Sequence, residues 1–99
     1  MIVISSDLLK VFTLSPSEVD VYWDPSDFTD VKYYTLFYRE HSEDDDTVFQ
    51  TIRPDVTLSS YVIENLKPNT LYDFKFEAMA NEGYRIITEA SQIKTYKPG

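Results

Sequence analysis

The stretch NLKPNTLYDFKFEA, residues 65–78, decides the fold class of this chain. Its first half contains Pro68 and Asn69, two residue types that favour turns. In its second half, residues 72–78, Tyr, Phe, Phe and Ala alternate with Asp, Lys and Glu. Alternation with a period of two is typical of a strand that buries one face. The stretch therefore predicts a chain corner followed by a half-buried strand.

The tyrosine at the start of this strand predicts a specific sandwich topology. A Tyr that follows a corner of this kind is typical of Greek-key β-sandwiches, in which its hydroxyl bonds the backbone of the corner. We expect such a bond at Tyr72. The rest of the chain contains no apolar run of helical period, and turn residues recur roughly every 8–12 residues, which favours an all-β sandwich of about seven short strands.

Alternation also assigns the expected strands and the expected core. The expected strands span residues 8–14, 18–23, 31–40, 47–53, 58–63, 72–78 and 84–95. The side chains expected to fill the space between the two sheets are Trp23, Tyr34, Leu36, Leu66, Tyr72, Phe74 and Phe76.

Composition limits the classes of partner. The chain has 99 residues, which suffices for one domain. Nine basic and seventeen acidic residues give a net charge of −8, which argues against nucleic acid and against anionic lipid as partners. The absence of cysteine excludes disulfides, a Cys-based zinc site and a thiol nucleophile. No apolar run reaches the roughly 18 residues of a membrane span.

Several spaced motifs occur in order along the chain. They are Leu9-x-Val11-x-x-Leu14, Val19-x-Val21-x-Trp23, Tyr34-x-Leu36-x-Tyr38, Tyr61-x-Ile63-x-x-Leu66-x-Pro68-x-Thr70-x-Tyr72 and Tyr72-x-Phe74-x-Phe76-x-Ala78. Together they resemble a fibronectin type III domain over almost the whole length. The resemblance implies an immunoglobulin-like, seven-stranded Greek-key sandwich over residues 9–96. Residues 1–8 would form a lead-in, and residues 97–99 a linker to a following module.

The chain departs from the pattern of this family at three places. Ala80 stands where an Asn is common, and Ser91 where an apolar residue is usual. The loop at residues 81–85 reads NEGYR and lacks Arg-Gly-Asp, which removes the simplest argument for integrin binding.

No catalytic or metal-binding pattern stands out. His41 is the single histidine and lies in an acidic loop, where we expect it to be solvated. There is no Gly-x-Ser-x-Gly elbow, and a small two-sheet core offers no deep cleft. The acids of residues 43–46 could supply oxygen ligands to calcium but lack the spacing of an EF-hand. We therefore predict no enzyme activity, no cofactor and no metal.

The outward face of the strand at residues 31–40 is the first candidate for protein binding. Tyr33 and Phe37 alternate with core residues and should face solvent, and Met79 should lie beside them on the neighbouring strand. Tyr, Phe and Met are enriched in interface cores. Alternatively, the long side chains of residues 39, 75 and 77 cover these rings as ordinary cross-strand pairs.

The loop after residue 80 is the second candidate. It carries Tyr84 and Arg85, which are residue types enriched in binding hot spots. Loops on a rigid sandwich scaffold often carry binding residues.

The sequence thus favours a non-catalytic protein-interaction and spacer module within a larger receptor or adhesion protein. The resemblance, not the composition, implies an extracellular or cell-surface setting. An intracellular scaffold module of the muscle type and a spacer attached to a secreted enzyme stay open as alternatives. The expected partners are a receptor, a ligand or a second copy of the chain, together with neighbouring domains. Self-association through Tyr33 and Phe37 should be abolished by Tyr33→Ala combined with Phe37→Ala.

Overall fold

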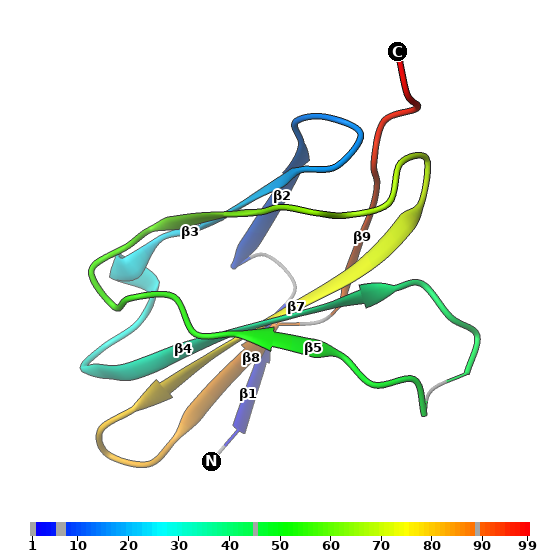
Figure 1. Cartoon of the computed structure of the whole chain (residues 1–99). Helices are drawn as coiled ribbons and strands as arrows, with labels where there is room; N and C mark the ends of the chain where they lie inside the picture. The colour runs from blue at the N-terminus through cyan, green and yellow to red at the C-terminus, as the bar shows by residue number, and fades with distance from the viewer. Residues whose placement is uncertain (1, 6–7, 45, 89) are drawn as a thin grey trace.

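The chain folds into two β-sheets packed face to face (Figure 1). The computed structural model describes residues 2–5, 8–44, 46–88 and 90–99. Its strands are β1 (Ile2–Ser5), β2 (Leu9–Thr13), β3 (Val19–Trp23), β4 (Val31–Glu40), β5 (Gln50–Ile52), β6 (Ser60–Ile63), β7 (Leu71–Ala80), β8 (Arg85–Thr88) and β9 (Ser91–Lys94), with a short 3-10 turn at Pro25–Asp27. The predicted all-β, immunoglobulin-like sandwich is confirmed.

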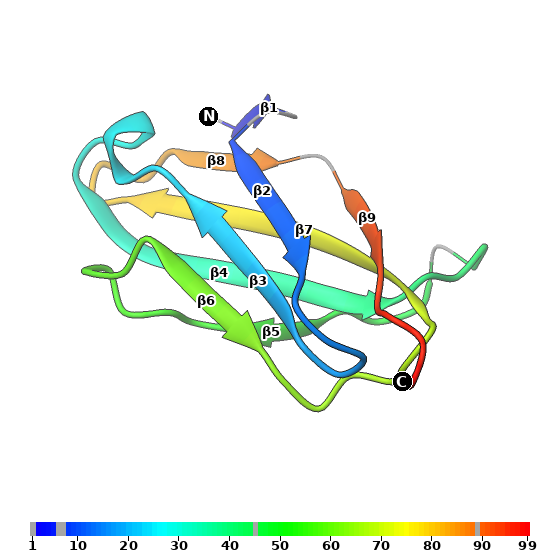
Figure 2. The ribbon, with the colours of Figure 1, turned by 90° about the horizontal axis from the view of Figure 1, so that it is seen from above.

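The two sheets differ in size. The small sheet has the order β2-β3-β6, and the large sheet has the order β1-β8-β7-β4-β5 with β9 also paired to β7. Figure 2 shows β2, β3 and β6 lying across the strands of the large sheet. β1 pairs with β8 in parallel, from Ile2 opposite Arg85 to Ser5 opposite Thr88. Residues 2–5, expected in a lead-in, thus add a strand to the large sheet.

The expected last strand, residues 84–95, is divided into β8 and β9. Glu77 of β7 pairs with Ile87, and Phe74 pairs with Ser91. The step is three residues along β7 but four along its partner, so the register shifts by one residue between β8 and β9. The Thr88 hydroxyl accepts the Phe76 N–H at 2.9 Å near this shift, which satisfies a buried donor of β7.

A stacked aromatic cluster joins the two sheets. Trp23 of the small sheet stacks on Phe76 of the large sheet with ring centroids 4.8 Å apart, and Tyr34 lies 5.2 Å from the same Phe76 ring. Phe28, which follows the 3-10 turn, completes this cluster. The residues expected in the core are all buried: Trp23, Tyr34, Leu36, Leu66, Tyr72, Phe74 and Phe76.

The corner between β6 and β7 has the expected tyrosine bond. The Lys67 N–H donates to the Tyr72 hydroxyl at 2.8 Å. Asn65 and Asn69 adopt left-handed backbone angles, with φ of 63° and 51°, which Asn tolerates better than most residues. The buried Thr95 hydroxyl donates to the Lys67 carbonyl at 2.6 Å and so fastens the C-terminal segment to the corner.

Candidate functional site

The aromatic rings on the outer face of the large sheet are partly covered. The guanidinium of Arg53 lies over the Tyr33 ring, 3.8 Å from its centroid. The Phe37 ring packs edge-to-face against Phe49, with centroids 6.4 Å apart. Tyr33 and Phe37 are therefore half-buried, at the outward positions that alternation assigned to them.

Phe49 is the centre of this outer face. The guanidinium carbon of Arg39 lies 4.3 Å from the Phe49 centroid and the Lys75 ammonium lies 4.5 Å from it. Cations over an aromatic face are attracted by the ring quadrupole. The stems of Arg39 and Lys75 were expected to cover rings here, whereas the part played by Phe49 was not anticipated.

Two carboxylates on the same face are buried. Asp73 is 3% exposed and accepts from Arg39 Nε at 3.2 Å, while Glu77 is 7% exposed and pairs with Arg85 Nη1 at 3.1 Å. Buried carboxylates require such partners, because an unpaired buried charge is strongly destabilising. Arg39 and Arg85 thus cover Asp73 and Glu77, two acidic residues that the alternating pattern of β7 places on the outward face.

His41 is exposed just after the end of β4, as expected of a solvated residue, and its ring also joins this network. Its Nδ1 lies 3.0 Å from Asp73 Oδ1, and its Nε2 lies 3.6 Å from Glu43 Oε1. The hydrogen bond to Asp73 raises the pKa of His41 above its ordinary value. Partial burial of the ring opposes this shift but is the smaller effect.

The loop between β7 and β8 leads through Tyr84 to Arg85 at the start of β8, and both residues are half-buried. The Tyr84 hydroxyl lies 3.5 Å from the Thr29 carbonyl oxygen, a long contact, and Arg85 pairs with Glu77 as described. Gly83 has φ of 91°, which an L-residue rarely adopts, so this loop requires glycine there. Met79 lies next to this loop, opposite both Tyr33 and Arg85, and is half-buried.

The outer face of the small sheet exposes an apolar patch, which we define as Phe12, Tyr22 and Val62. These side chains are 52%, 42% and 38% exposed. Phe12 and Tyr22 meet edge-to-face with centroids 5.7 Å apart. The neighbouring Asp20 raises the pKa of the Tyr22 hydroxyl, first through hydrogen bonding and then through its charge.

The outward orientation of the residues in this patch could be predicted from the sequence, but their proximity could not. Alternation places Phe12 and Tyr22 on the faces opposite the core residues Val11 and Val21. Their proximity depends on the register of β2 and β3, in which Phe12 lies opposite Asp20 and Lys10 opposite Tyr22. That register makes the two rings diagonal neighbours, within reach of each other.

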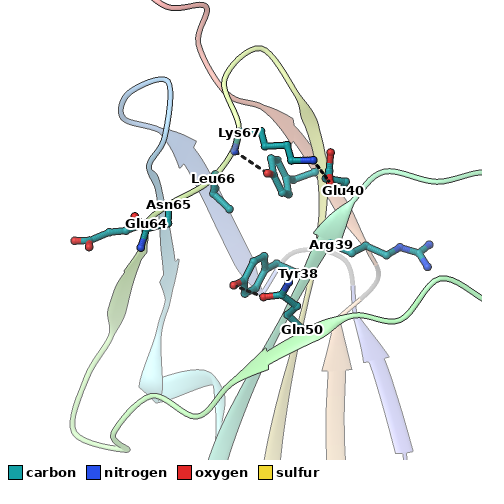
Figure 3. A pocket seen from close by; sticks show the side chains of 9 residues that line it. Tyr38, Arg39, Glu40, Gln50, Glu64, Asn65, Leu66 and Lys67 are labelled. Atoms are coloured by element: carbon teal, nitrogen blue, oxygen red, sulfur yellow. Dashed lines mark hydrogen bonds and ion pairs between the residues drawn. The ribbon is translucent and has the colours of Figure 1, made fainter.

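A groove runs along the open side of the sandwich between β5 and the corner after β6 (Figure 3). Its volume is about 340 Å³, and Tyr38 and Leu66 face into it from opposite sides. The Tyr38 hydroxyl donates to Gln50 Oε1 at 2.8 Å, and Lys67 Nζ pairs with Glu40 at 3.2 Å. A second groove of about 310 Å³, which shares Tyr38 with the first, continues along β6 past Ile52 and Tyr61.

Within the described ranges, no group of three or more His, Cys, Asp or Glu side chains is arranged to hold a metal ion. Asp45, one of the acids considered as a calcium ligand, lies outside those ranges. Among the described elements, no helix is both long and apolar enough to cross a lipid bilayer.

Comparison with known families decides the classification. The sequence profile of the family described as "Fibronectin type III domain" matches residues 7–94. The chain is a fibronectin type III domain. Domains of this family are generally non-catalytic protein-interaction modules.

Several relatives are longer than this domain. The human protein Target of Nesh-SH3 is 35% identical over 77 residues, which cover 67% of this domain but 7% of that protein. The chicken CNTN1 FN1–FN3 structure has a TM-score of 0.77 and 28% identity, over 95% of this domain and 32% of that chain. The domain of human contactin 1 has a TM-score of 0.78 and 22% identity, over 94% of this domain and 77% of that chain. The domain therefore spans a small fraction of the first two relatives.

Proposed function

We propose that this domain is a non-catalytic protein-interaction and spacer module of a longer extracellular or cell-surface protein. The exposed Phe12–Tyr22 pair carries the proposal, because exposed aromatic patches on soluble domains mark protein contacts. The relative Target of Nesh-SH3 is named as the target of another protein, which agrees with a binding role.

The positions of the chain ends support the spacer part. β1 and the C-terminal residues lie on opposite sides of the sandwich in Figure 1. The principal extents are 46 × 29 × 20 Å. A domain whose two ends lie on opposite sides holds its neighbours apart, and the chicken structure, of which this domain covers 32%, is longer than one such domain.

The outer face of the large sheet is the second candidate surface. The predicted contact residues on this face are still Tyr33, Phe37 and Met79. They form a half-buried surface together with neighbouring rings and cations. The Tyr84 and Arg85 loop adjoins this face, because Arg85 pairs with Glu77 of β7. A partner for this face would need acidic groups, since Arg53 and Lys75 have no carboxylate partner within the described residues.

The test is a binding screen of the domain against purified ectodomains and extracellular-matrix proteins by surface plasmon resonance. The double variant Phe12→Ser, Tyr22→Ser should weaken binding of the partner at least about tenfold, the loss typical of hot-spot residues. Val48→Ser is the matched control, because Val48 is 84% exposed in a distant loop.

The outcomes separate the surfaces. Equal binding by wild type and the small-sheet variant would eliminate that patch. If Tyr33→Ala combined with Phe37→Ala abolishes binding instead, the large sheet is the contact face. A domain that binds nothing in the screen would keep only its spacer role.

A further inference from the structure

Strand β6 is an unprotected edge of the small sheet. It reads SYVI, has no charged residue and no proline, and pairs with β3 in continuous register without a bulge. Folded proteins usually protect exposed edges with charges, prolines, bulges or covering segments. The opposite edge strand, β2, lies beside β9, and the Thr13 hydroxyl donates to the Lys94 carbonyl of β9 at 2.9 Å.

The hydrogen-bond register shows which backbone groups of β6 point outward. The Trp23 N–H donates to the Ser59 carbonyl at 3.1 Å, and these two residues lie opposite each other in the extended register. Because bonded and non-bonded pairs alternate in antiparallel sheets, Tyr61 and Ile63 also bond β3. The N–H and C=O groups of Ser60 and Val62 therefore face away from β3, and the described strands supply no partner for them.

An additional strand at this edge would find apolar surface on its outer face and a mainly polar groove on its inner face. Side chains on its inner face would enter the groove that passes Tyr38, Ile52 and Tyr61. Side chains on its outer face would extend the row that ends in Val62, next to Tyr22 of β3. This arrangement suits an extended segment that is apolar on its outer face and polar on its inner face.

The charge around the edge favours a basic occupant. Glu64 follows β6, lines both grooves and points away from Tyr38 in Figure 3. It forms no ion pair among the described residues. Asp20 lies on the outer face directly opposite Val62. The net charge of −8 opposes pairing with a second copy of the chain and attracts a cationic segment.

We propose that β6 binds an extended segment of a partner protein, apolar on its outer face and carrying Lys or Arg, as a fourth strand of the small sheet. The inference rests on the proposed protein-binding function and specifies its partner class. The backbone of Ser60 and Val62 provides the hydrogen bonds, the outer-face patch at Tyr22 and Val62 selects apolar side chains, and Glu64 selects the cation.

The test is amide hydrogen exchange by NMR with a synthetic peptide of about eight residues, the length of an ordinary strand. Val and Thr alternate in the peptide, and two Lys residues stand at one end. At saturation the exchange of the Ser60 and Val62 amides should slow at least about tenfold, because both gain a partner. The amides of Tyr61 and Ile63 should change little, because they already bond β3. This alternation of affected and unaffected amides is specific to strand addition.

Two controls distinguish the contribution of the backbone hydrogen bonds to peptide binding from the contributions of the Val62 side chain and of the peptide's charge. Val62→Pro removes the outward N–H and should weaken the peptide about tenfold, whereas Val62→Thr keeps it and should weaken the peptide less. The peptide with Glu in place of Lys should bind at least about tenfold more weakly, as expected for like charges. If Val62→Pro does not fold, the exchange pattern of the wild type still decides.

Three results would overturn the inference. One is the absence of binding at about 1 mM Lys peptide, where even weak complexes form. Another is equal affinity for the Lys and Glu peptides. The third is concentration-dependent protection of Ser60 and Val62 without peptide, which would make a second copy the occupant. The proposed function is judged separately by the Phe12 and Tyr22 variant and its natural partner, so failure of strand addition alone leaves that proposal standing.

Discussion

Single side chains outside the stacked core carry much of the specificity of this domain. The Thr95 hydroxyl and the Asp73 carboxylate bond groups from a distant part of the chain, and the Tyr72 hydroxyl accepts the Lys67 N–H from across the corner. Such bonds gain little in net free energy but are costly to break, because the abandoned partner stays buried.

The first prediction concerns the corner. Tyr72→Phe keeps the buried ring and removes the acceptor of the Lys67 N–H, so it should lower the free energy of unfolding by about 1–3 kcal/mol in urea titrations. Tyr96→Phe is the control, because Tyr96 is 55% exposed, and it should change stability by less than about 0.5 kcal/mol. Equal effects of both changes would mean that the hydroxyl bond does not support the corner.

The second prediction concerns pH. Asp73 raises the pKa of His41, so protonation of His41 is more favourable in the folded state than in the unfolded state. The resulting stabilisation is complete below the ordinary His pKa of about 6.5 and is lost as the pH rises through the raised pKa. His41→Gln should therefore destabilise the domain at about pH 5.5 and have little effect at about pH 9. Chemical unfolding at both pH values measures this, and a pH-independent loss would exclude a charge effect.

At the scale of elements, side chains compensate for irregular strands. The last strand shifts register between β8 and β9, and the Thr88 hydroxyl accepts the Phe76 N–H near the shift. A buried backbone donor must have a partner, so an irregular strand requires a side-chain acceptor of this kind.

The third prediction concerns the Thr88 hydroxyl, which accepts a backbone N–H in place of a carbonyl of the neighbouring strand. Thr88→Val has nearly the same shape but leaves the Phe76 N–H unpaired, and it should cost about 1–3 kcal/mol in thermal or urea unfolding. Thr88→Ser keeps the hydroxyl and should cost less. If Ser and Val are equally destabilising, the methyl contact and not the hydroxyl is important.

At the scale of the whole molecule, one aromatic cluster holds the two sheets together. Trp23 stacks on Phe76 and lies 5.5 Å from Tyr34, so three rings from three strands form the centre of the core. The outer faces then differ: the large sheet is covered by cations and rings, whereas the small sheet leaves its apolar patch exposed.

The fourth prediction tests this centre. Trp23→Ala should lower the free energy of unfolding by about 3–5 kcal/mol, a large fraction of the roughly 5–15 kcal/mol of an ordinary domain. Tyr22→Ala, at the adjacent exposed position, should cost about 1 kcal/mol or less. A small loss for Trp23→Ala would mean that the sheets are held together mainly elsewhere.

Much of the fold could be predicted from the sequence, because apolar and polar residues alternate along a strand that buries one face. This alternation shows which side chains point toward the core. The corner at Pro68 and Asn69, the strand from Tyr72 to Ala78 and the face that buries Trp23 are local properties of this kind. So is the outward orientation of Tyr33 and Phe37.

What covers an outward residue was decided only by the tertiary structure. Arg53 lies on Tyr33 and Phe49 on Phe37 because β5 pairs with β4, and His41 meets Asp73 across two strands. The exposure of the small-sheet patch and of the β6 edge likewise depends on which strands are neighbours. Alternation reports the side of a strand on which a residue lies, but contacts between distant segments determine whether that side meets solvent, a cation or another strand.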